Sequence, residues 1–133
     1  DIAAEELVAV DCDIWIPAAR PDAIHEGNVD SVKAKLIVPG ANIAVTAAAE
    51  ACLHARGVTV LPDIIVNAGG VICAFVEYQG GTHSQAFQMI EDKIAANVRE
   101  VLEQTSRDFA PRAAAEKMAR RRLDTAMKIR RSF

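Results

Sequence analysis

Residues 62–71 are PDIIVNAGGV, a glycine-containing turn between two apolar runs. The run before it, residues 58–61, is rich in β-branched side chains and predicts a strand. Gly69 and Gly70 closely follow Asn67, and a backbone without a Cβ can be approached closely by another group. In parallel α/β sheets, ligands bind beyond the carboxyl ends of the strands. We therefore predict that this turn forms the ligand-facing edge of the chain.

The composition is that of a globular protein, with 51% apolar and 25% charged residues in a chain of 133. This length corresponds to one domain or a piece of one. The net charge of −3 provides no basic field for nucleic acid, and no apolar run approaches the ~20 residues of a membrane span. The three cysteines and three histidines lack disulfide or metal-ligand spacing. We therefore expect reduced, buried cysteines, no metal, no nucleic acid or membrane partner, and a cytoplasmic location.

Three short apolar segments separated by helical sequence predict a parallel sheet. The segments are residues 12–17, 34–38 and 58–61, and a proline closes or follows each. Between the last two, residues 47–56 are strong helix formers. Thr46 is placed to cap this helix, and Gly57 stands where helices commonly end in a left-handed residue. This alternation is typical of βαβ units.

The last third of the chain is predicted to be helical. Apolar residues recur at helical spacing over residues 85–106, and a second helix is expected from Pro111 to about residue 130. The buried side of that second helix is expected to carry Ala115, Met118, Ala119, Leu123, Ala126 and Met127. A short helix is also expected over residues 1–8. Residues 71–78 are ambiguous, because β-branched and aromatic side chains favour a strand by propensity.

A parallel sheet of this kind suggests a nucleotide-binding fold. The usual phosphate-binding loops are absent from the sequence, however, since no GxGxxG or Walker A motif occurs. Three other motifs follow one another along the chain: CDIWIPAA at residues 12–19, VPGAN at 38–42 and PDIIVNAGGV at 62–71. Together they resemble the nucleotide-binding domain of the glutamate/leucine/phenylalanine/valine dehydrogenases. The resemblance extends over essentially the whole chain.

The resemblance implies an α/β fold, namely a partial Rossmann-like (doubly wound) parallel sheet with two C-terminal helices. Residues 1–84 would be the second half of an NAD(P)-binding domain, and residues 85–133 a helical segment packed on it. Residues 71–78 are then expected to be helical, against their propensity. The free edge of such a half-sheet predicts association into a homo-oligomer.

The family catalyses the reversible oxidative deamination of an L-amino acid to a 2-oxo acid, with NAD or NADP accepting the hydride. Its catalytic lysine and aspartate lie in a preceding substrate domain. The resemblance therefore implies that this chain holds no catalytic residue and is inactive alone. It implies cofactor contacts at Ala18, Ala19, Asn42 and Asn67, and substrate contacts at Val71 and Ala74.

Individual roles follow from the same match. Ala19 is implied to lie against the adenosine-ribose side of the cofactor, and Asn42 toward the nicotinamide ribose. Asn67 is implied to contact the nicotinamide end, where an amide can both donate and accept. Two departures from the family stand out. Ala74 replaces the serine that holds the distal carboxylate in glutamate-specific members, and residues 43–47 are IAVTA where the family commonly has GPTTP.

Simpler interpretations of these residues remain open. Residues 67–70 alone are typical of a structural turn, Asn42 of a turn or cap, and Asp63 of a turn cap rather than a base. A non-catalytic module for ligand sensing or oligomerisation is the alternative function. Arginines at residues 120–122 allow an RNA-binding helix, but a solvated charged face is favoured because no aromatic residues are interleaved.

Overall fold

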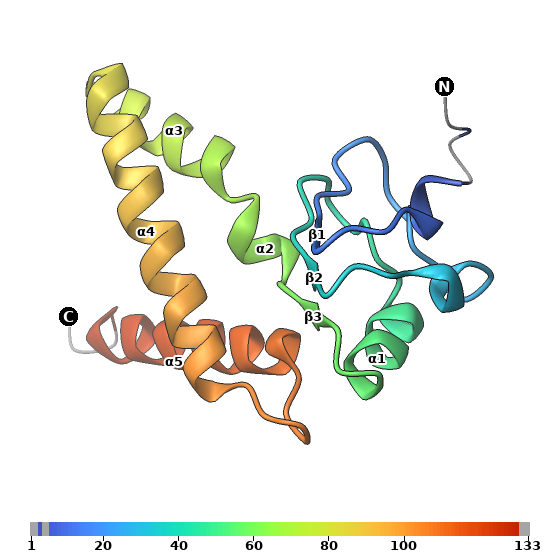
Figure 1. The fold of residues 1–133 in the computed structure, drawn as a ribbon. Helices are drawn as coiled ribbons and strands as arrows, with labels where there is room; N and C mark the ends of the chain where they lie inside the picture. Colours follow the sequence, from blue (N-terminus) through green and yellow to red (C-terminus); the bar gives the residue numbers. More distant parts are fainter. Residues whose placement is uncertain (1–2, 4–5, 131–133) are drawn as a thin grey trace.

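A computed structural model describes residues 3 and 6–130, which form the α/β fold drawn in Figure 1. The three parallel strands lie in the order β1 (Ile14–Trp15), β2 (Leu36–Ile37) and β3 (Thr59–Val60). Ile14 lies opposite Leu36, and Leu36 lies opposite Thr59. Helices follow the sheet to the end of the described chain. The predicted combination of a partial parallel sheet and C-terminal helices is confirmed.

The first strand is shorter and more exposed than expected. Within residues 12–17 the strand comprises Ile14 and Trp15, and the side chains of Ile14 and Ile16 are 56% and 60% exposed. The cause is the strand order, because β1 is an edge strand with β2 on one side among the described residues. The expectation of a buried strand is therefore wrong for this segment.

The helix between β2 and β3 agrees with the prediction. It is α1 (Ala47–Ala55), and the Thr46 hydroxyl accepts a hydrogen bond from the Ala49 amide at 3.2 Å. Gly57 follows with φ = +82°, a conformation that side chains with a Cβ disfavour. Leu53 is fully buried between α1 and the sheet. The capping and termination signals in the sequence thus set the limits of this helix.

The sheet, α1 and two short 3₁₀ helices form what we call the sheet lobe, residues 6–61. The 3₁₀ helices are η1 (Leu7–Ala9) and η2 (Val29–Ser31). The core of the lobe consists of apolar side chains: Val8, Ile24, Val29, Val32, Ala34, Ile37, Val45, Ala49, Leu53 and Val60. Of the helix expected over residues 1–8, residues 1–2 and 4–5 lie outside the described residues, and residues 7–8 belong to η1. The three cysteines are free and half-buried, less buried than expected.

Residues 71–78 are helical, as the family resemblance implies. They belong to α3 (Gly69–Tyr78), which follows the short helix α2 (Asp63–Val66) and leads away from the sheet (Figure 1). Strand propensity is overridden because α3 packs along α4 (His83–Gln104), where Val76 and Ala86 are each 4% exposed. A capping box between Thr82 and Gln85 begins α4.

The final helix, α5 (Pro111–Arg130), crosses α4 and forms a second core with it. This core consists of Ile65, Val101, Ala114, Ala115 and Met118. The prediction of the buried side is correct for Ala115 and Met118. It is wrong for Ala119, Leu123, Ala126 and Met127, which are exposed. Because the helices cross (Figure 1), the buried apolar contact of α5 with α4 ends at Met118.

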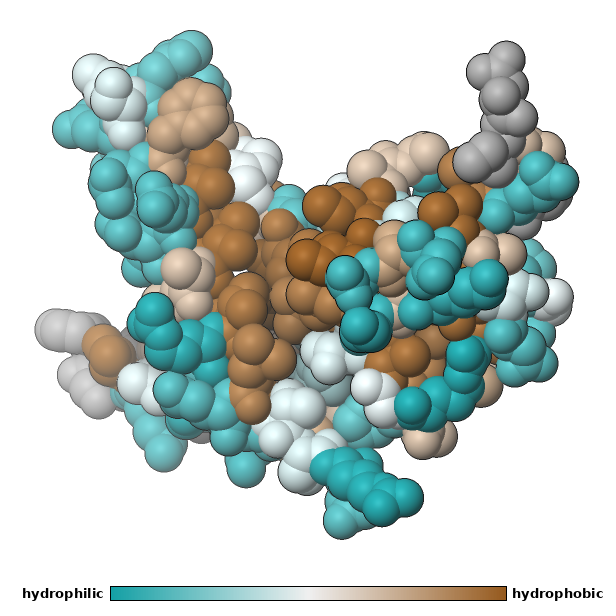
Figure 2. All heavy atoms as spheres, viewed as in Figure 1, coloured by the Kyte–Doolittle hydropathy of each residue, from teal (hydrophilic) through white to brown (hydrophobic). Residues whose placement is uncertain are grey.

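The α3–α4 pair and the sheet lobe stand apart with a hollow between them. Figure 2 shows apolar residues gathered along the walls of this hollow. Val71 and Phe75, both on α3, are 77% and 55% exposed. None of the helices that the described residues form has the length and apolar content needed to cross a membrane.

Candidate functional site

Two predicted site residues meet at the carboxyl edge of the sheet. Asn42 lies in the loop after β2, and Asn67 lies at the end of α2, after β3. The Asn67 Nδ2 atom donates to the Asn42 Oδ1 atom at 2.5 Å. Parallel strands bring their carboxyl ends to one edge, so side chains 25 residues apart in sequence come together there.

The loop after β1 contacts the same edge. The amides of Gly40 and Ala41 donate to the Pro17 carbonyl at 3.0 and 3.1 Å. A Cβ on Gly40 would lie 2.8 Å from the Cβ of Ala18, so only glycine permits this approach. Ala18 is therefore adjacent to the loop that carries Asn42.

The Asn42 loop is held in an unfavourable backbone conformation. Ile43 has φ = +54°, in the left-handed region that β-branched residues rarely occupy. Its carbonyl accepts a hydrogen bond from the Asp22 amide at 2.8 Å, and Ile24 pairs with Val45 in a parallel bridge. The loop is thereby fixed to residues 22–24 on one side.

Asp63 fixes the other side of this loop. Its Oδ2 atom accepts a hydrogen bond from the Ile43 amide at 2.7 Å, and its Oδ1 atom accepts one from Arg112 Nη2 at 3.1 Å. Arg112 Nε also donates to Glu50 Oε2 at 2.8 Å. Asp63 and Glu50 are each only 5% exposed. The sequence interpretation of Asp63 as a turn cap omits this buried network, which joins α1, α2 and α5.

The two carboxylates of this network differ in acidity. Burial raises the pKa of Glu50 above its usual range, and this effect outweighs the hydrogen bond and charge of Arg112. Burial acts in the same direction on Asp63, but hydrogen bonds from the Ile43 amide and Arg112 outweigh it and lower the pKa. Backbone hydrogen bonds from Ile43 and Ile64 favour the anion of Asp63, and Glu50 has no comparable backbone contribution.

Arg112 is the member of this network that sequence reasoning missed. Its two partners lie 62 and 49 residues away in sequence, and no local pattern connects them. The available signal was its position directly after Pro111, in the first turn of a helix. There a cation opposes the helix macrodipole and therefore needs a compensating anion.

Val71 and Ala74 lie three residues apart on α3 and are both exposed. Beside Gly70, no heavy atom lies within 4 Å of where a Cβ would stand. At Gly69 the nearest atom is 3.8 Å away, on Ile90. Among the described residues, packing therefore does not demand glycine at either position.

Ala18 and Ala19 line a different pocket from the asparagine pair. This pocket, of about 200 Å³, also includes Trp15, Pro17 and Arg20. The structure thus places the predicted cofactor residues in two groups along the same edge of the sheet. Within the described residues, no group of three or more His, Cys, Asp or Glu side chains is arranged to hold a metal ion.

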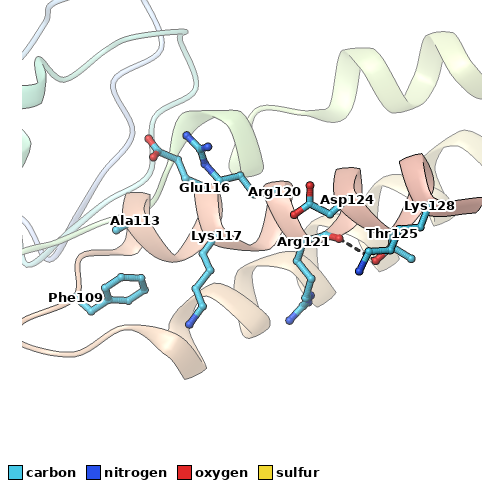
Figure 3. Close-up of a pocket in the computed structure, with 9 residues that line it drawn as sticks. All are labelled: Phe109, Ala113, Glu116, Lys117, Arg120, Arg121, Asp124, Thr125 and Lys128. Atoms are coloured by element: carbon cyan, nitrogen blue, oxygen red, sulfur yellow. Dashed lines mark hydrogen bonds between the residues drawn. The ribbon is translucent and has the colours of Figure 1, made fainter. Parts of the chain in front are cut away.

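A larger pocket, of about 570 Å³, lies along α5 and contains none of the predicted site residues. Figure 3 shows its lining, with Lys117 and Arg121 on one side of the helix and Glu116 and Asp124 on another. Lys117 lies over the Phe109 ring, 5.7 Å from its centroid. The mixture of charges on this open surface favours solvation over binding of one charged ligand.

The arginine run of α5 is engaged with α4. Arg121 and Arg122 both form ion pairs with Glu100, and Arg122 also donates to Asn97 at 2.9 Å. These arginines therefore connect the two helices, in addition to contributing to a charged surface.

Comparisons with known proteins give a consistent result. A profile of the Glutamate/Leucine/Phenylalanine/Valine dehydrogenase family matches residues 1–131. The chain is 42% identical over 135 residues to an NADP-specific glutamate dehydrogenase of Saccharolobus shibatae, covering 95% of this chain and 32% of the relative. It is 39% identical over 140 residues to a glutamate dehydrogenase of Aeropyrum pernix, covering 97% and 34%. The chain thus spans about a third of the length of these relatives.

A solved structure agrees with the sequence comparisons. The hetero-hexameric glutamate dehydrogenase of Thermus thermophilus, in its Leu-bound form, superposes with a TM-score of 0.83 at 26% identity. The match covers 98% of this chain and 33% of that one.

Proposed function

Because the chain belongs to the glutamate/leucine/phenylalanine/valine dehydrogenase family, we propose that it positions nicotinamide and substrate in an NAD(P)-dependent L-amino acid dehydrogenase. The reaction is reversible oxidative deamination to a 2-oxo acid. The observation that carries the proposal is the hydrogen-bonded pair of Asn42 and Asn67 at the carboxyl edge of the sheet. In this proposal residues 1–84 belong to the nucleotide-binding domain, and residues 85–133 are the helical segment packed on it.

The asparagine pair fits a nicotinamide group. Its mutual bond uses one N–H of Asn67 and one oxygen of Asn42. A carboxamide or ribose also presents donors and acceptors. It can bind the remaining side-chain groups, which are the oxygen and second N–H of Asn67 and the N–H groups of Asn42. The open space beside Gly70 allows a planar ring to approach the backbone.

The contribution of this chain is orientation. The bound cofactor supplies the hydride chemistry, and the protein holds the nicotinamide against the α-carbon of the substrate. Correct orientation of two reactants can lower the activation free energy by roughly 7–11 kcal/mol. The chain carries no proposed acid, base or nucleophile, so the catalytic groups would come from a separate substrate domain.

Substrate preference is assigned to the exposed side of α3. Val71 and Ala74 present apolar side chains next to the turn that carries Asn67. Ala74 has no hydroxyl to hold a distal carboxylate, and a buried polar group left without its partner costs about 1–3 kcal/mol, a charged group more. We therefore propose a glutamate-dehydrogenase-like enzyme whose preference for glutamate is weakened at this position.

We further propose a cytoplasmic homo-oligomer. The edge strand β1 leaves Ile14 exposed, and the hollow beside α3 adds further uncovered apolar surface. Covering such surface stabilises an assembly.

Replacement of Asn67 by alanine in the complete enzyme tests the proposal. We expect turnover to fall about 100-fold, because misplacing reacting groups by about 1 Å can cost that much, while the free energy of unfolding changes little. Asn97→Ala, on α4, is the matched control, because Asn97 contacts Arg122 rather than the sheet edge. Unchanged steady-state kinetics in the Asn67 variant would refute the assignment and favour a non-catalytic module.

A further inference from the structure

We propose that Asp63 is a positioning residue for the nicotinamide site, held in its working orientation by Arg112 of α5. The proposal rests on the function proposed above for Asn42 and Asn67. It extends the site to a buried ion-pair network and to a helix that does not itself reach the sheet edge.

The argument begins with a closed ring of hydrogen bonds. The Asp63 carboxylate accepts from the Ile43 amide at 2.7 Å, and Ile43 directly follows Asn42. The Asn42 side-chain oxygen accepts from the Asn67 side chain at 2.5 Å, and the Asn67 backbone N–H donates to the Asp63 backbone carbonyl at 3.0 Å. Asp63 therefore holds both asparagines, one through its side chain and one through its backbone.

The ring holds a loop conformation that the sequence itself disfavours. Ile43 adopts φ = +54°, a left-handed conformation that is unfavourable for a residue with a Cβ. In this conformation the Ile43 amide is directed at the Asp63 carboxylate. Loss of the carboxylate removes a charge-assisted bond, and the loop is then free to relax. Asn42 would move with it.

Arg112 orients the carboxylate. Its guanidinium donates from Nη2 to Asp63 Oδ1 and from Nε to Glu50 Oε2. The planar guanidinium fixes the donor directions, which leaves Asp63 Oδ2 facing the loop. Pro111, the preceding residue, is fully buried, so the first turn of α5 is anchored. The position of α5 therefore determines the orientation of Asp63 and, through it, the position of Asn42 and Asn67.

Glu50 provides a matched comparison. It binds the same arginine and has the same exposed fraction of 5%, but within the described part of the chain its side chain makes no hydrogen bond to the loop that carries Asn42. Glu50→Gln and Asp63→Asn each replace a carboxyl partner of Arg112 by a neutral amide at nearly constant volume. Only Asp63→Asn also disturbs the loop, because an amide group cannot accept from both Ile43 and Arg112 through separate oxygens.

The experiment uses the complete enzyme carrying Asp63→Asn or Glu50→Gln. The first measurement is the ¹H–¹⁵N NMR signals of the Asn42 and Asn67 side-chain amides, which do not depend on activity. The second is the dissociation constant of reduced nicotinamide cofactor, followed by its fluorescence. We expect Asp63→Asn to shift both amide signals and weaken cofactor binding about tenfold, the effect of one lost charge-assisted hydrogen bond. Glu50→Gln should change neither.

Equal effects of the two substitutions would overturn the proposal, because they would show a network that only stabilises the fold. Unchanged amide signals in Asp63→Asn would also overturn it. If Asp63→Asn does not fold, Arg112→Lys tests the same point, since it keeps the charge but loses the fixed donor directions and should shift the same amides. Unaltered kinetics in Asn67→Ala would instead remove the proposed function, so the two failures are distinguishable.

Discussion

Substitution of Ile43 provides a test of the strain in the Asn42 loop. Ile43 has φ = +54°, and its side chain is 62% exposed. Replacement by alanine removes most side-chain contacts but keeps the Cβ that disfavours this backbone conformation. Replacement by glycine removes the same contacts and the Cβ as well. The difference between the two variants therefore isolates the conformational effect from the packing effect.

The expected magnitude follows from two opposing contributions. A left-handed conformation costs a residue with a Cβ roughly 1–2 kcal/mol, and glycine avoids this cost. Glycine loses more backbone entropy than alanine on folding, which costs about 0.5–1 kcal/mol. We therefore expect Ile43→Gly to have a free energy of unfolding about 1 kcal/mol higher than that of Ile43→Ala.

Urea unfolding of both variants measures this difference, with Ile64 as the control position. Ile64 is 53% exposed and lies within α2, where the backbone is helical. There the order should reverse, with the glycine variant about 1 kcal/mol less stable than the alanine variant. If glycine is also the less stable residue at position 43, the loop is unstrained and the reasoning about Ile43 is wrong.

Two further predictions concern specificity and pH. Ala74→Ser should raise kcat/KM for glutamate relative to leucine by about tenfold, because it restores a hydroxyl partner for the distal carboxylate. Ala51→Ser, on the exposed face of α1, is the control. An unchanged ratio of the two kcat/KM values in Ala74→Ser would contradict the assignment. Burial raises the pKa of Glu50, so the folded state retains a proton that the unfolded state releases. The free energy of unfolding should therefore fall as pH rises from the unfolded pKa, about 4.3, through the folded pKa. Glu50→Gln should abolish this fall in urea titrations at successive pH values. Asp63 has a lowered pKa, so its contribution is present above the unfolded pKa of about 3.9 and is lost as pH falls through the folded pKa. Asp63→Asn should remove this loss of stability in acid. If the free energy of unfolding of both variants depends on pH in the same way as that of the unsubstituted protein, the statements about Glu50 and Asp63 are wrong.

Local signals in the sequence specify much of the fold. The Thr46 hydroxyl, the φ of Gly57 and the start of α5 at Pro111 each depend on a few neighbouring residues, and each agrees with the prediction. Residues 71–78 show the limit of such signals. Their propensity favours a strand, but the partner they pack on is a helix, and only the family resemblance indicated this.

The errors concern crossings and edges. The apolar spacing of Leu123 and Met127 predicts a buried face, yet the angle at which α5 crosses α4 determines where that face ends. A crossing angle depends on side chains of both helices and has no local sequence signal. The exposure of Ile14 has a related cause, since it depends on which strands stand beside β1.

For the candidate site, the sequence indicated the residues that we propose to face a ligand, and it missed the residues that hold them in place. Asn42 and Asn67 lie in recognisable motifs and meet as strand order requires. Asp63 and Arg112 lie 49 residues apart, and only the packing of α5 against α2 brings them together. A buried ion pair between distant elements is a product of tertiary structure, so it leaves no periodicity to detect.

The two departures from the family pattern lie on different parts of this arrangement, and their effects should therefore separate. Ile43 belongs to the ring that Asp63 closes, so its substitution acts on loop conformation, stability and the cofactor. Ala74 lies on the exposed side of α3, outside that ring, so we expect its substitution to act on substrate choice alone. Combining Ile43→Gly with Ala74→Ser should then give additive changes in free energy, because sites without shared partners rarely interact by more than about 0.5 kcal/mol. A larger interaction energy would mean that the loop and α3 form one unit, with substrate choice coupled to the cofactor loop.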